Sequence, residues 1–339
     1  MPVRVLLVND SATARAALRA ALADEPDIVI VQELSSGANA VEMVEQVDPD
    51  VVLMDIVMPR ADGYEVTRRI LRARRVPILM VSASVSPTDV AVALEALRAG
   101  AIAVLEAPPP PSEPTYDVKR RAIIHTVRSA AALPRSRLAR PGKHETPVSL
   151  TSPELPQRSY SIAGIVASLG GPPVVAEILA ALPPDHPPVL LVQHIESSFV
   201  DGFLTWLRGA VKTRVMLATH GAPAERGCVY IAPGDHHLGV ARDGSLALST
   251  APPIGGFRPS GNHLLHTLAM AYGRRAVGVV LTGMGRDGAE GARALHDAEG
   301  FVIAQDEASC AVAGMTNSAR ERGAVDVSLV PAAIAAHIR

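Results

Sequence analysis

The chain has 339 residues and a mass of 35.4 kDa, a length typical of about two domains. Hydrophobic residues make up 48% and charged residues 19% of the sequence, which excludes a largely disordered chain. The formal net charge of -2 argues against a broadly basic nucleic-acid binder. Two cysteines, Cys228 and Cys310, are too few for a disulfide framework and fit a reducing cytosol. No apolar run approaches the ~18 residues of a membrane span, so we expect a cytoplasmic protein that does not insert into a membrane.

The first 132 residues alternate between continuous apolar runs and segments with helical spacing of apolar residues. Short continuous apolar runs are typical of strands that are buried on both faces. The predicted elements, in chain order and starting with a strand, are Val3–Val8, Ala12–Ala23, Ile28–Val31, Ala38–Val47, Val51–Met54, Glu65–Arg72, Ile78–Val81, Pro87–Ala99, Ile102–Leu105 and Asp117–Leu133. Strands that alternate with helices in this way predict a parallel, doubly wound α/β sheet.

Polar residues follow three of these strands: Asn9 and Asp10, then Asp55, then Ser82. Ligands of such sheets bind beyond the carboxyl ends of the strands. Two acids and a hydroxyl at one edge could bind Mg²⁺ and accept a phosphoryl group, because Mg²⁺ prefers oxygen ligands and a carboxylate can act as a nucleophile. The alternative is that these side chains only cap the helices that follow.

Three segments around these residues resemble the response-regulator receiver domain, and the match covers about residues 1–132. The segments are Val8-Asn9-Asp10-Ser11, Leu53-Met54-Asp55-Ile56-Val57-Met58-Pro59-Arg60-Ala61-Asp62-Gly63 and Met80-Val81-Ser82-Ala83. The resemblance implies a flavodoxin-like fold. It also implies that Asp55 is the phosphoacceptor, that Asp10 and Asp55 bind Mg²⁺, and that Ser82 is the switch hydroxyl.

The receiver departs from the family pattern at two positions. The family has two adjacent acids after the first strand, and here the first of them is Asn9. It also has a lysine just before the proline that follows the fifth strand, and here that place falls to Ala107. Loss of this fixed cation removes electrostatic stabilisation from phosphoryl transfer and from switching. We therefore expect an atypical receiver with impaired or unconventional phosphorylation.

Residues 133–158 lack periodicity and are rich in proline and serine, which is typical of a linker. This places the two predicted domains at 1–132 and 159–339. Between Lys119 and Lys143 there are eight basic and no acidic residues. The run indicates either contact with an acidic partner or, as we favour, a solvated helix face leading into the linker.

Three predicted strands of the second half each precede a residue with catalytic chemistry. They are Tyr160–Ala167 before Ser168, Val189–Gln193 before His194, and Ala276–Leu281 before the loop with Asp287. Parallel strands present their carboxyl ends at one edge of the sheet, so we expect the three side chains to converge. Serine, histidine and aspartate are the nucleophile, base and orienting acid of a hydrolytic triad. Each could instead cap a turn or helix or end a core strand, but their joint position favours the triad.

A second indication of hydrolytic chemistry is the turn Ser168-Leu169-Gly170-Gly171-Pro172. It connects a predicted strand to the predicted helix Val174–Leu182. Glycines let the backbone approach a ligand closely, and the N–H groups of such a turn point at developing negative charge. A phosphate-binding turn would have a similar sequence. The Gly-x-x-x-x-Gly-Lys pattern is absent from the chain, which argues against a Walker-type nucleotide hydrolase.

Four histidines, His236, His237, His263 and His266, raise the question of a metal site. No cluster of cysteine or carboxylate residues completes such a site, so a metal here is not favoured. We expect hydrolysis without a cofactor.

A tight turn at Asp243-Gly244 fits a hairpin between Leu238–Ala241 and Ser245–Leu248. We expect this hairpin to be a small antiparallel addition to an otherwise mostly parallel sheet. Predicted helix Ala289–Ala298 then follows Asp287.

Residues 159–339 are similar to the chemotaxis protein-glutamate methylesterase and glutamine deamidase family. The segments that carry the similarity are Ala167-Ser168-Leu169-Gly170-Gly171-Pro172, Val192-Gln193-His194, Ile231-Ala232-Pro233-Gly234-Asp235-His236-His237, Arg258-Pro259-Ser260, Thr282-Gly283-Met284-Gly285-Arg286-Asp287-Gly288 and Ala304-Gln305-Asp306-Glu307-Ala308-Ser309-Cys310. The similarity implies a metal-free Ser168–His194–Asp287 triad, with backbone around Leu169 and Met284 on the oxyanion side.

The family similarity also implies partners and regulation. Methyl-accepting chemoreceptors would be the substrates, hydrolysed at glutamate methyl esters and glutamines of their cytoplasmic helices. A chemotaxis histidine kinase would phosphorylate Asp55, and the receiver would cover the hydrolase site until then. Leu169 replaces the family's threonine and Asn262 a common acid. Two alternatives stay open: a weakly active or inactive regulator that binds receptors or kinase, and a serine hydrolase for another ester or amide.

Overall fold

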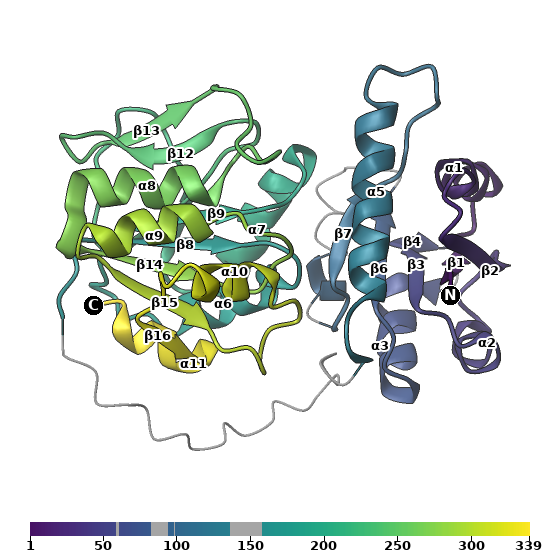
Figure 1. The fold of residues 1–339 in the computed structure, drawn as a ribbon. Coiled ribbons are helices and arrows are strands. Elements are labelled where there is room, and N and C mark those ends of the chain that lie inside the picture. The colour runs from purple at the N-terminus through teal and green to yellow at the C-terminus, as the bar shows by residue number, and fades with distance from the viewer. Residues whose placement is uncertain (59–60, 83–93, 98, 136–157) are drawn as a thin grey trace. The chain divides into compact units, whose positions relative to one another are not determined.

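The computed structural model describes residues 1–58, 61–82, 94–97, 99–135 and 158–339. The chain divides into two compact units, Met1–Glu145 and Thr146–Arg339 (Figure 1). The predicted linker lies outside the described residues except at its ends. Of the predicted helix Pro87–Ala99, the described segment Leu94–Leu97 is helical. In the part of the chain that the structure describes, no helix is long and apolar enough to cross a membrane.

The first unit contains a five-stranded parallel sheet in the order β2-β1-β3-β6-β7. Its strands are β1 (Val3–Val8), β2 (Ile28–Leu34), β3 (Val51–Asp55), β6 (Ile78–Ser82) and β7 (Ala103–Glu106). Every residue of β3 and β6 is buried, which explains why both sequences are apolar up to their last residues, Asp55 and Ser82. The strand order reverses between β1 and β3, and this switch point is where doubly wound sheets bind ligands. The predicted flavodoxin-like α/β fold is confirmed.

Helices cover this sheet, and two short antiparallel strands follow β3 in the chain. The helices are α1 (Ala12–Leu22), α2 (Ala40–Val47), α3 (Gly63–Ala73) and α5 (Tyr116–Ala131), and the pair is β4 (Val57–Met58) with β5 (Ala61–Asp62). Helix α1 starts at Ser11, whose hydroxyl accepts a hydrogen bond from the Ala14 N–H at 3.2 Å. Such capping by serine is the expected helix start.

The basic residues of α5, and Arg135 just after it, make ion pairs within their own unit. The pairs are Arg120 with Glu25 at 2.7 Å, Arg128 with Asp27 at 2.6 Å, and Arg135 with Asp48 at 2.5 Å. These partners belong to loops that follow α1 and α2, far away in sequence. The expectation of a merely solvated basic face is therefore incomplete, because part of the run fastens α5 to the unit's acidic loops.

The second unit contains a seven-stranded sheet, all of whose strands are parallel, in the order β10-β11-β9-β8-β14-β15-β16. They are β8 (Ile162–Ala167), β9 (Val189–Gln193), β10 (Arg214–Leu217), β11 (Cys228–Ile231), β14 (Ala276–Val280), β15 (Phe301–Gln305) and β16 (Val327–Leu329). After β8, the next strands of the chain, β9 to β11, are added on one side of β8. The chain then crosses over and adds β14 to β16 on the other side of β8. Strands β8, β9 and β14 thus flank the switch point of this sheet, as the doubly wound α/β prediction requires.

Helices pack on both faces of this sheet (Figure 1). They are α6 (Gly171–Ala180), α7 (Val200–Ala210), α8 (Gly261–Tyr272), α9 (Ala289–Asp297), α10 (Gly314–Glu321) and α11 (Pro331–Ile334). The start of α8 lies directly on β8, because a Cβ at Gly261 would stand 2.2 Å from a methyl of Val166. Glycine is therefore required where the helix begins at the carboxyl end of the strand.

The predicted hairpin is present, but it is not part of the parallel sheet. Strands β12 (His237–Val240) and β13 (Leu246–Ser249) pair with each other in a separate antiparallel sheet. The expected addition to the main sheet is therefore wrong. The hairpin packs on α8 instead, where the Thr267 hydroxyl accepts from the Val240 N–H at 3.2 Å, and its buried Leu238 and Leu246 join the same core.

Candidate active site

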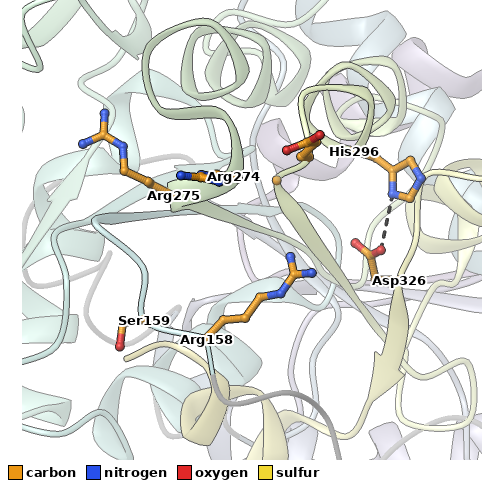
Figure 2. Close-up of a pocket in the computed structure, with 8 residues that line it drawn as sticks. Arg158, Ser159, Arg274, Arg275, His296 and Asp326 are labelled. Atoms are coloured by element: carbon orange, nitrogen blue, oxygen red, sulfur yellow. Dashed lines mark ion pairs between the residues drawn. The ribbon is translucent and has the colours of Figure 1, made fainter.

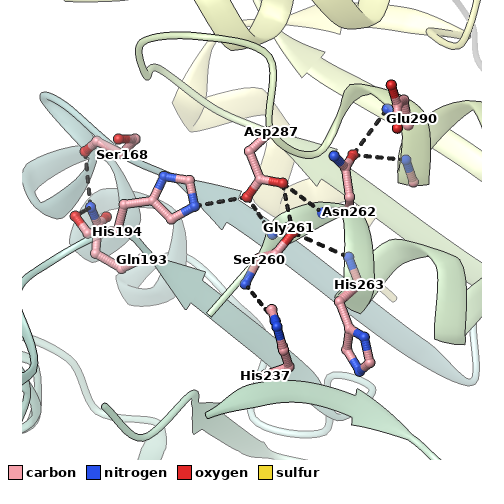
Figure 3. A network of polar contacts seen from close by, with 11 residues as sticks. Ser168, Gln193, His194, His237, Ser260, Gly261, Asn262, His263, Asp287 and Glu290 are labelled. Atoms are coloured by element: carbon pink, nitrogen blue, oxygen red, sulfur yellow. Dashed lines mark hydrogen bonds and ion pairs between the residues drawn. The ribbon is translucent and has the colours of Figure 1, made fainter. Parts of the chain in front are cut away.

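The residues expected at the strand ends lie there in the structure (Figure 3). Ser168 directly follows β8, and its N–H donates to the carbonyl of Thr282 at 3.0 Å. His194 directly follows β9, and its N–H donates to the carbonyl of Ala167 at 2.9 Å. Asp287 lies in the loop between β14 and α9. The parallel sheet thus brings three segments that are far apart in sequence to one edge.

His194 and Asp287 form a buried hydrogen-bonded pair. The Nε2 atom of His194 lies 2.8 Å from Oδ2 of Asp287, and their side chains are only 8% and 2% exposed. A carboxylate can only accept, so Nε2 carries the proton and Nδ1 has the lone pair. Nδ1 is buried and has no hydrogen-bond partner among the described residues. The nitrogen left to act as a base is therefore Nδ1.

Asp287 also accepts hydrogen bonds from the start of α8. The Ser260 hydroxyl donates at 2.7 Å, the Gly261 N–H at 2.6 Å and the Asn262 N–H at 3.1 Å. Burial raises the pKa of Asp287, but hydrogen bonds from His194, Ser260 and Gly261 outweigh burial, and its pKa lies below the ordinary value. The positive end of the α8 dipole acts in the same direction. Asp287 is therefore a fixed anion beside the imidazole.

Sequence reasoning missed Phe257, which stacks on His194 with ring centroids 4.1 Å apart and an interplanar angle of 7°. Phe257 ends a tight turn in which it exchanges two backbone hydrogen bonds with Ile254, at 3.0 and 3.1 Å. Gly255 and Gly256 between them have φ angles of 60° and 90°, a conformation that suits glycine. The Gly-Gly pair signalled a turn, but nothing local in the sequence placed that turn over His194.

His237 is fully buried beside the start of α8. Its Nδ1 accepts from the Ser260 N–H at 3.2 Å, and its Nε2 lies 3.2 Å from the carbonyl oxygen of Pro252. Both ring nitrogens are thus used by the backbone, which leaves His237 no lone pair for a metal. His263 stacks on His237 at 4.9 Å. Burial and the nearby His237 lower the pKa of His263.

The turn after Ser168 is closely packed. Gly170 has a φ of 74°, and a Cβ at Gly171 would lie 2.4 Å from Oε1 of Gln193. Gln193 in turn donates from Nε2 to the Ser168 carbonyl at 2.9 Å. The glycines therefore let the backbone of this turn lie close to the end of β9, because they have no side chain in the way.

The two predicted oxyanion-side residues, Leu169 and Met284, are half-buried. The carbonyl of Leu169 accepts from the Thr282 hydroxyl at 3.0 Å. Gly283, which precedes Met284, has no room for a side chain, because a Cβ there would stand 2.7 Å from the Cβ of Ser168. The two turns therefore touch, and Thr282 supplies a hydroxyl in this region although position 169 does not.

Asn262 also has a defined role. Its Oδ1 accepts from the N–H groups of Glu290 and Gly291, both at 3.0 Å, which caps α9 with a side chain from α8. The amide is therefore a structural link behind Asp287.

The receiver residues lie at the switch point of the first sheet. Asp10 follows β1 and is half-buried, buried Asp55 ends β3, and buried Ser82 ends β6. Oδ1 of Asn9 accepts from the Ser11 N–H at 2.8 Å, so this oxygen is already engaged. Mg²⁺ in phosphoryl-transfer sites is bound by one or two carboxylates, with water and phosphate oxygens completing its shell. Asp10 and Asp55 fit this reduced ligand set.

The position expected to hold a lysine is Ala107, whose N–H donates to the Ser82 carbonyl at 2.7 Å. Lys119 of α5 reaches the same strand end, but its ammonium pairs with the carboxylate of Glu106. This pairing neutralises a charge that could otherwise stand in for the missing lysine.

A separate cavity of about 620 Å³ occurs in the second unit (Figure 2). It is lined by Arg158, Ser159, Arg274, Arg275, His296, Glu299, Gly300 and Asp326. Most of these residues precede strands, so the cavity lies at the amino ends of the sheet and is distinct from the edge with Ser168. Asp326 there accepts from the Val302 N–H at 2.7 Å and lies 3.4 Å from Nδ1 of His296.

Two doubly wound units, one with aspartates at its switch point and one with Ser168, His194 and Asp287 at its own, define an α/β protein that joins a receiver-type unit to a hydrolase-type unit. The family description "CheB methylesterase" matches residues 163–338, and "Response regulator receiver domain" matches residues 5–113. The chain belongs to the CheB methylesterase family and carries an N-terminal receiver domain.

Sequence similarity to known proteins extends over almost the whole chain. A protein-glutamate methylesterase/protein-glutamine glutaminase of Anaeromyxobacter dehalogenans is 41% identical, covering 98% of this chain and 97% of the relative. One from Myxococcus xanthus is 41% identical, covering 93% and 90%. The crystal structure of the Thermotoga maritima CheB methylesterase catalytic domain matches with a TM-score of 0.51 and 34% identity, covering 53% of this chain and 98% of that one.

Proposed function

We propose that the protein hydrolyses methyl esters of glutamate side chains on the cytoplasmic helices of methyl-accepting chemoreceptors and deamidates glutamines there. Family membership and the names of the relatives supply the substrate class. The observation that carries the chemistry is the buried His194–Asp287 pair, with its free Nδ1, at the strand end beside Ser168. The proposed substrate places the reaction in the cytoplasm.

Ser168 is the proposed nucleophile. Its Oγ attacks the ester carbonyl while its proton passes to Nδ1 of His194, and the carbonyl oxygen becomes an oxyanion. Backbone N–H groups of the turns at Leu169 and Met284 supply donors to that oxyanion. Asp287 stabilises the imidazolium formed on His194.

Collapse of the tetrahedral intermediate completes acylation. The imidazolium returns its proton to the departing methoxide, which leaves as methanol. Water then gives a proton to His194 and attacks the glutamyl ester of Ser168. The imidazolium returns this proton to the departing Oγ of Ser168, which releases the glutamate carboxyl group and restores both the serine and the neutral histidine. An amide substrate follows the same path and releases ammonia.

The receiver is the proposed regulator. A chemotaxis histidine kinase would supply the phosphoryl group to Asp55, and Ser82 would act as the switch hydroxyl. Asp10 and Asp55 would hold Mg²⁺, which supplies positive charge against the phosphoryl oxygens when bound. Because Ala107 replaces the lysine, we expect slow phosphorylation and weak switching.

The test is methanol release from methylated chemoreceptor by the full chain and by Ser168→Ala. We expect release that Ser168→Ala abolishes. No release, with receptor binding retained, would favour the inactive regulator. Comparable turnover of small esters and of the receptor would favour a serine hydrolase with another substrate.

A further inference from the structure

Among the residues that the structure describes, a single polar contact restrains the ring of His194. Its Nε2 is bonded to Asp287, and its Nδ1 has no partner in the described part of the chain. The second side-chain torsion of histidine is broad, so a single hydrogen bond does not by itself fix the plane of the imidazole. The direction of Nδ1 therefore depends on what packs against the ring.

Phe257 packs against the ring face to face. The centroid separation of 4.1 Å and the angle of 7° leave no room for the imidazole to turn about its Cβ–Cγ bond, since either edge would meet the phenyl ring. Aromatic faces also attract cations, so the phenyl ring suits the imidazolium that forms after proton transfer. The contact of Phe257 with the candidate site that the structure records is this stacking on the His194 ring.

The segment that carries Phe257 is held at both ends by one buried residue. His237 contacts the carbonyl of Pro252 at 3.2 Å and accepts from the N–H of Ser260 at 3.2 Å. Between these points, the turn Ile254–Phe257 is closed by its two backbone hydrogen bonds. The segment that carries the phenyl ring is therefore anchored at both ends. At its end, the Ser260 hydroxyl donates a hydrogen bond to Asp287.

We propose that Phe257 is a positioning residue, whose ring fixes the plane of the His194 imidazole so that Nδ1 faces Ser168. This inference rests on the proposed ester hydrolysis. In Figure 3 the His194 ring lies between Ser168 and Asp287, which is the arrangement that Phe257 would preserve. Misplacement of a catalytic group by about 1 Å can cost about 100-fold in rate.

The experiment combines kinetics with NMR of the full chain. The variants are Phe257→Leu, which removes the aromatic face, and Phe257→Tyr, which retains it. Ile254→Ala is the matched control in the same turn, because that residue is 37% exposed. We expect Phe257→Leu to lower kcat for methylated receptor by about 10- to 100-fold with KM unchanged. Phe257→Tyr and Ile254→Ala should stay within about threefold of wild type.

The NMR measurement detects the stacking itself. In the wild type and in Phe257→Tyr, the ring protons of His194 should be shifted upfield by the aromatic ring current, and Phe257→Leu should lose this shift. Wild-type kcat in Phe257→Leu, or a change in KM alone, would overturn the positioning role. Absence of the upfield shift in the wild type would also overturn it. If the wild type released no methanol, the proposed hydrolysis would fail, while the NMR comparison would still decide the stacking.

Discussion

Asp287 is the residue on which most contacts of the candidate site converge. It accepts from the His194 ring, from the Ser260 hydroxyl, and from the N–H groups of Gly261 and Asn262. The three donors from the start of α8 fix both carboxylate oxygens, so the proton-bearing nitrogen of His194 is fixed as well. The tautomer with a free Nδ1 is thus a consequence of where α8 begins.

We expect Asp287→Asn to lower kcat by about 10⁴-fold, because an amide no longer holds the imidazole in the required tautomer. Methanol release from methylated receptor measures this. Asp297→Asn is the control, since Asp297 lies at the far end of α9, where it pairs with exposed Arg293. More than a tenth of wild-type activity in Asp287→Asn would contradict the assigned role.

Asp287 also predicts a pH dependence of stability. Its pKa is lower in the folded chain than the ordinary value, so folding favours the carboxylate. The resulting stabilisation is present above the unfolded pKa of about 3.9 and is lost as the pH falls through the folded pKa. Between about pH 5 and pH 2 the wild type should therefore lose more unfolding free energy than Asp287→Asn. Urea titrations at several pH values measure the difference, and parallel curves would refute it.

At the scale of elements, the site depends on the junction of α8, the β12–β13 hairpin and the Phe257 turn. His237 starts β12, yet its ring accepts from the N-cap residue of α8. The hairpin therefore acts as a support for the end of α8 that holds Asp287. This explains why a polar residue is fully buried there.

Substitution of this support should destabilise the second unit. His237→Phe fills a similar volume but leaves the buried Ser260 N–H without an acceptor, which costs about 1–3 kcal/mol. Urea unfolding of the full chain measures this loss. His236→Phe is the control, because His236 precedes the hairpin and its Nδ1 lies 2.9 Å from the nearby Gly234 carbonyl oxygen. Equal stability of the two variants would show that the His237 contacts do not matter.

The elements that supply Ser168 and His194 were predictable from sequence. Strands β8 and β9 are fully buried, so their apolar runs are continuous and end where the catalytic candidates begin. Ser260, Phe257 and His237 could not be predicted in their roles. Each acts through a contact across the chain, and no local pattern indicates which strand end a turn or helix start will meet. The hairpin was expected from its turn, but its packing on α8 depends on tertiary contacts.

At the scale of the whole molecule, the two units carry unequal sets of functional residues. The second has the three proposed hydrolytic residues, Ser168, His194 and Asp287, at its switch point. The first has Asp10, Asp55 and Ser82 but Ala107 in place of a cation. The nearby ammonium of Lys119 is paired with Glu106. We therefore expect phosphorylation of the first unit to be a weaker activity than hydrolysis by the second.

Restoring the cation should strengthen phosphorylation. Removal of one donor that stabilises a transition-state anion costs about 10²–10³-fold in rate, so Ala107→Lys should raise the rate of Asp55 phosphorylation at least about tenfold. The backbone N–H of Ala107 donates a hydrogen bond to the carbonyl of Ser82, so the new side chain would start beside the proposed switch residue. Incubation of the full chain with Mg²⁺ and a small phosphodonor, followed by mass spectrometry, measures the rate.

Two controls test whether the effect depends on the position of the added charge and on Asp55. Ser112→Lys adds the same charge at an exposed site and should leave the rate unchanged, and Asp55→Asn should abolish phosphorylation in either background. Stable, stoichiometric phosphorylation of the wild type would contradict an impaired receiver. If Ala107→Lys also increased the stimulation of methanol release by the phosphodonor, the missing lysine would be what limits communication from the receiver to Ser168.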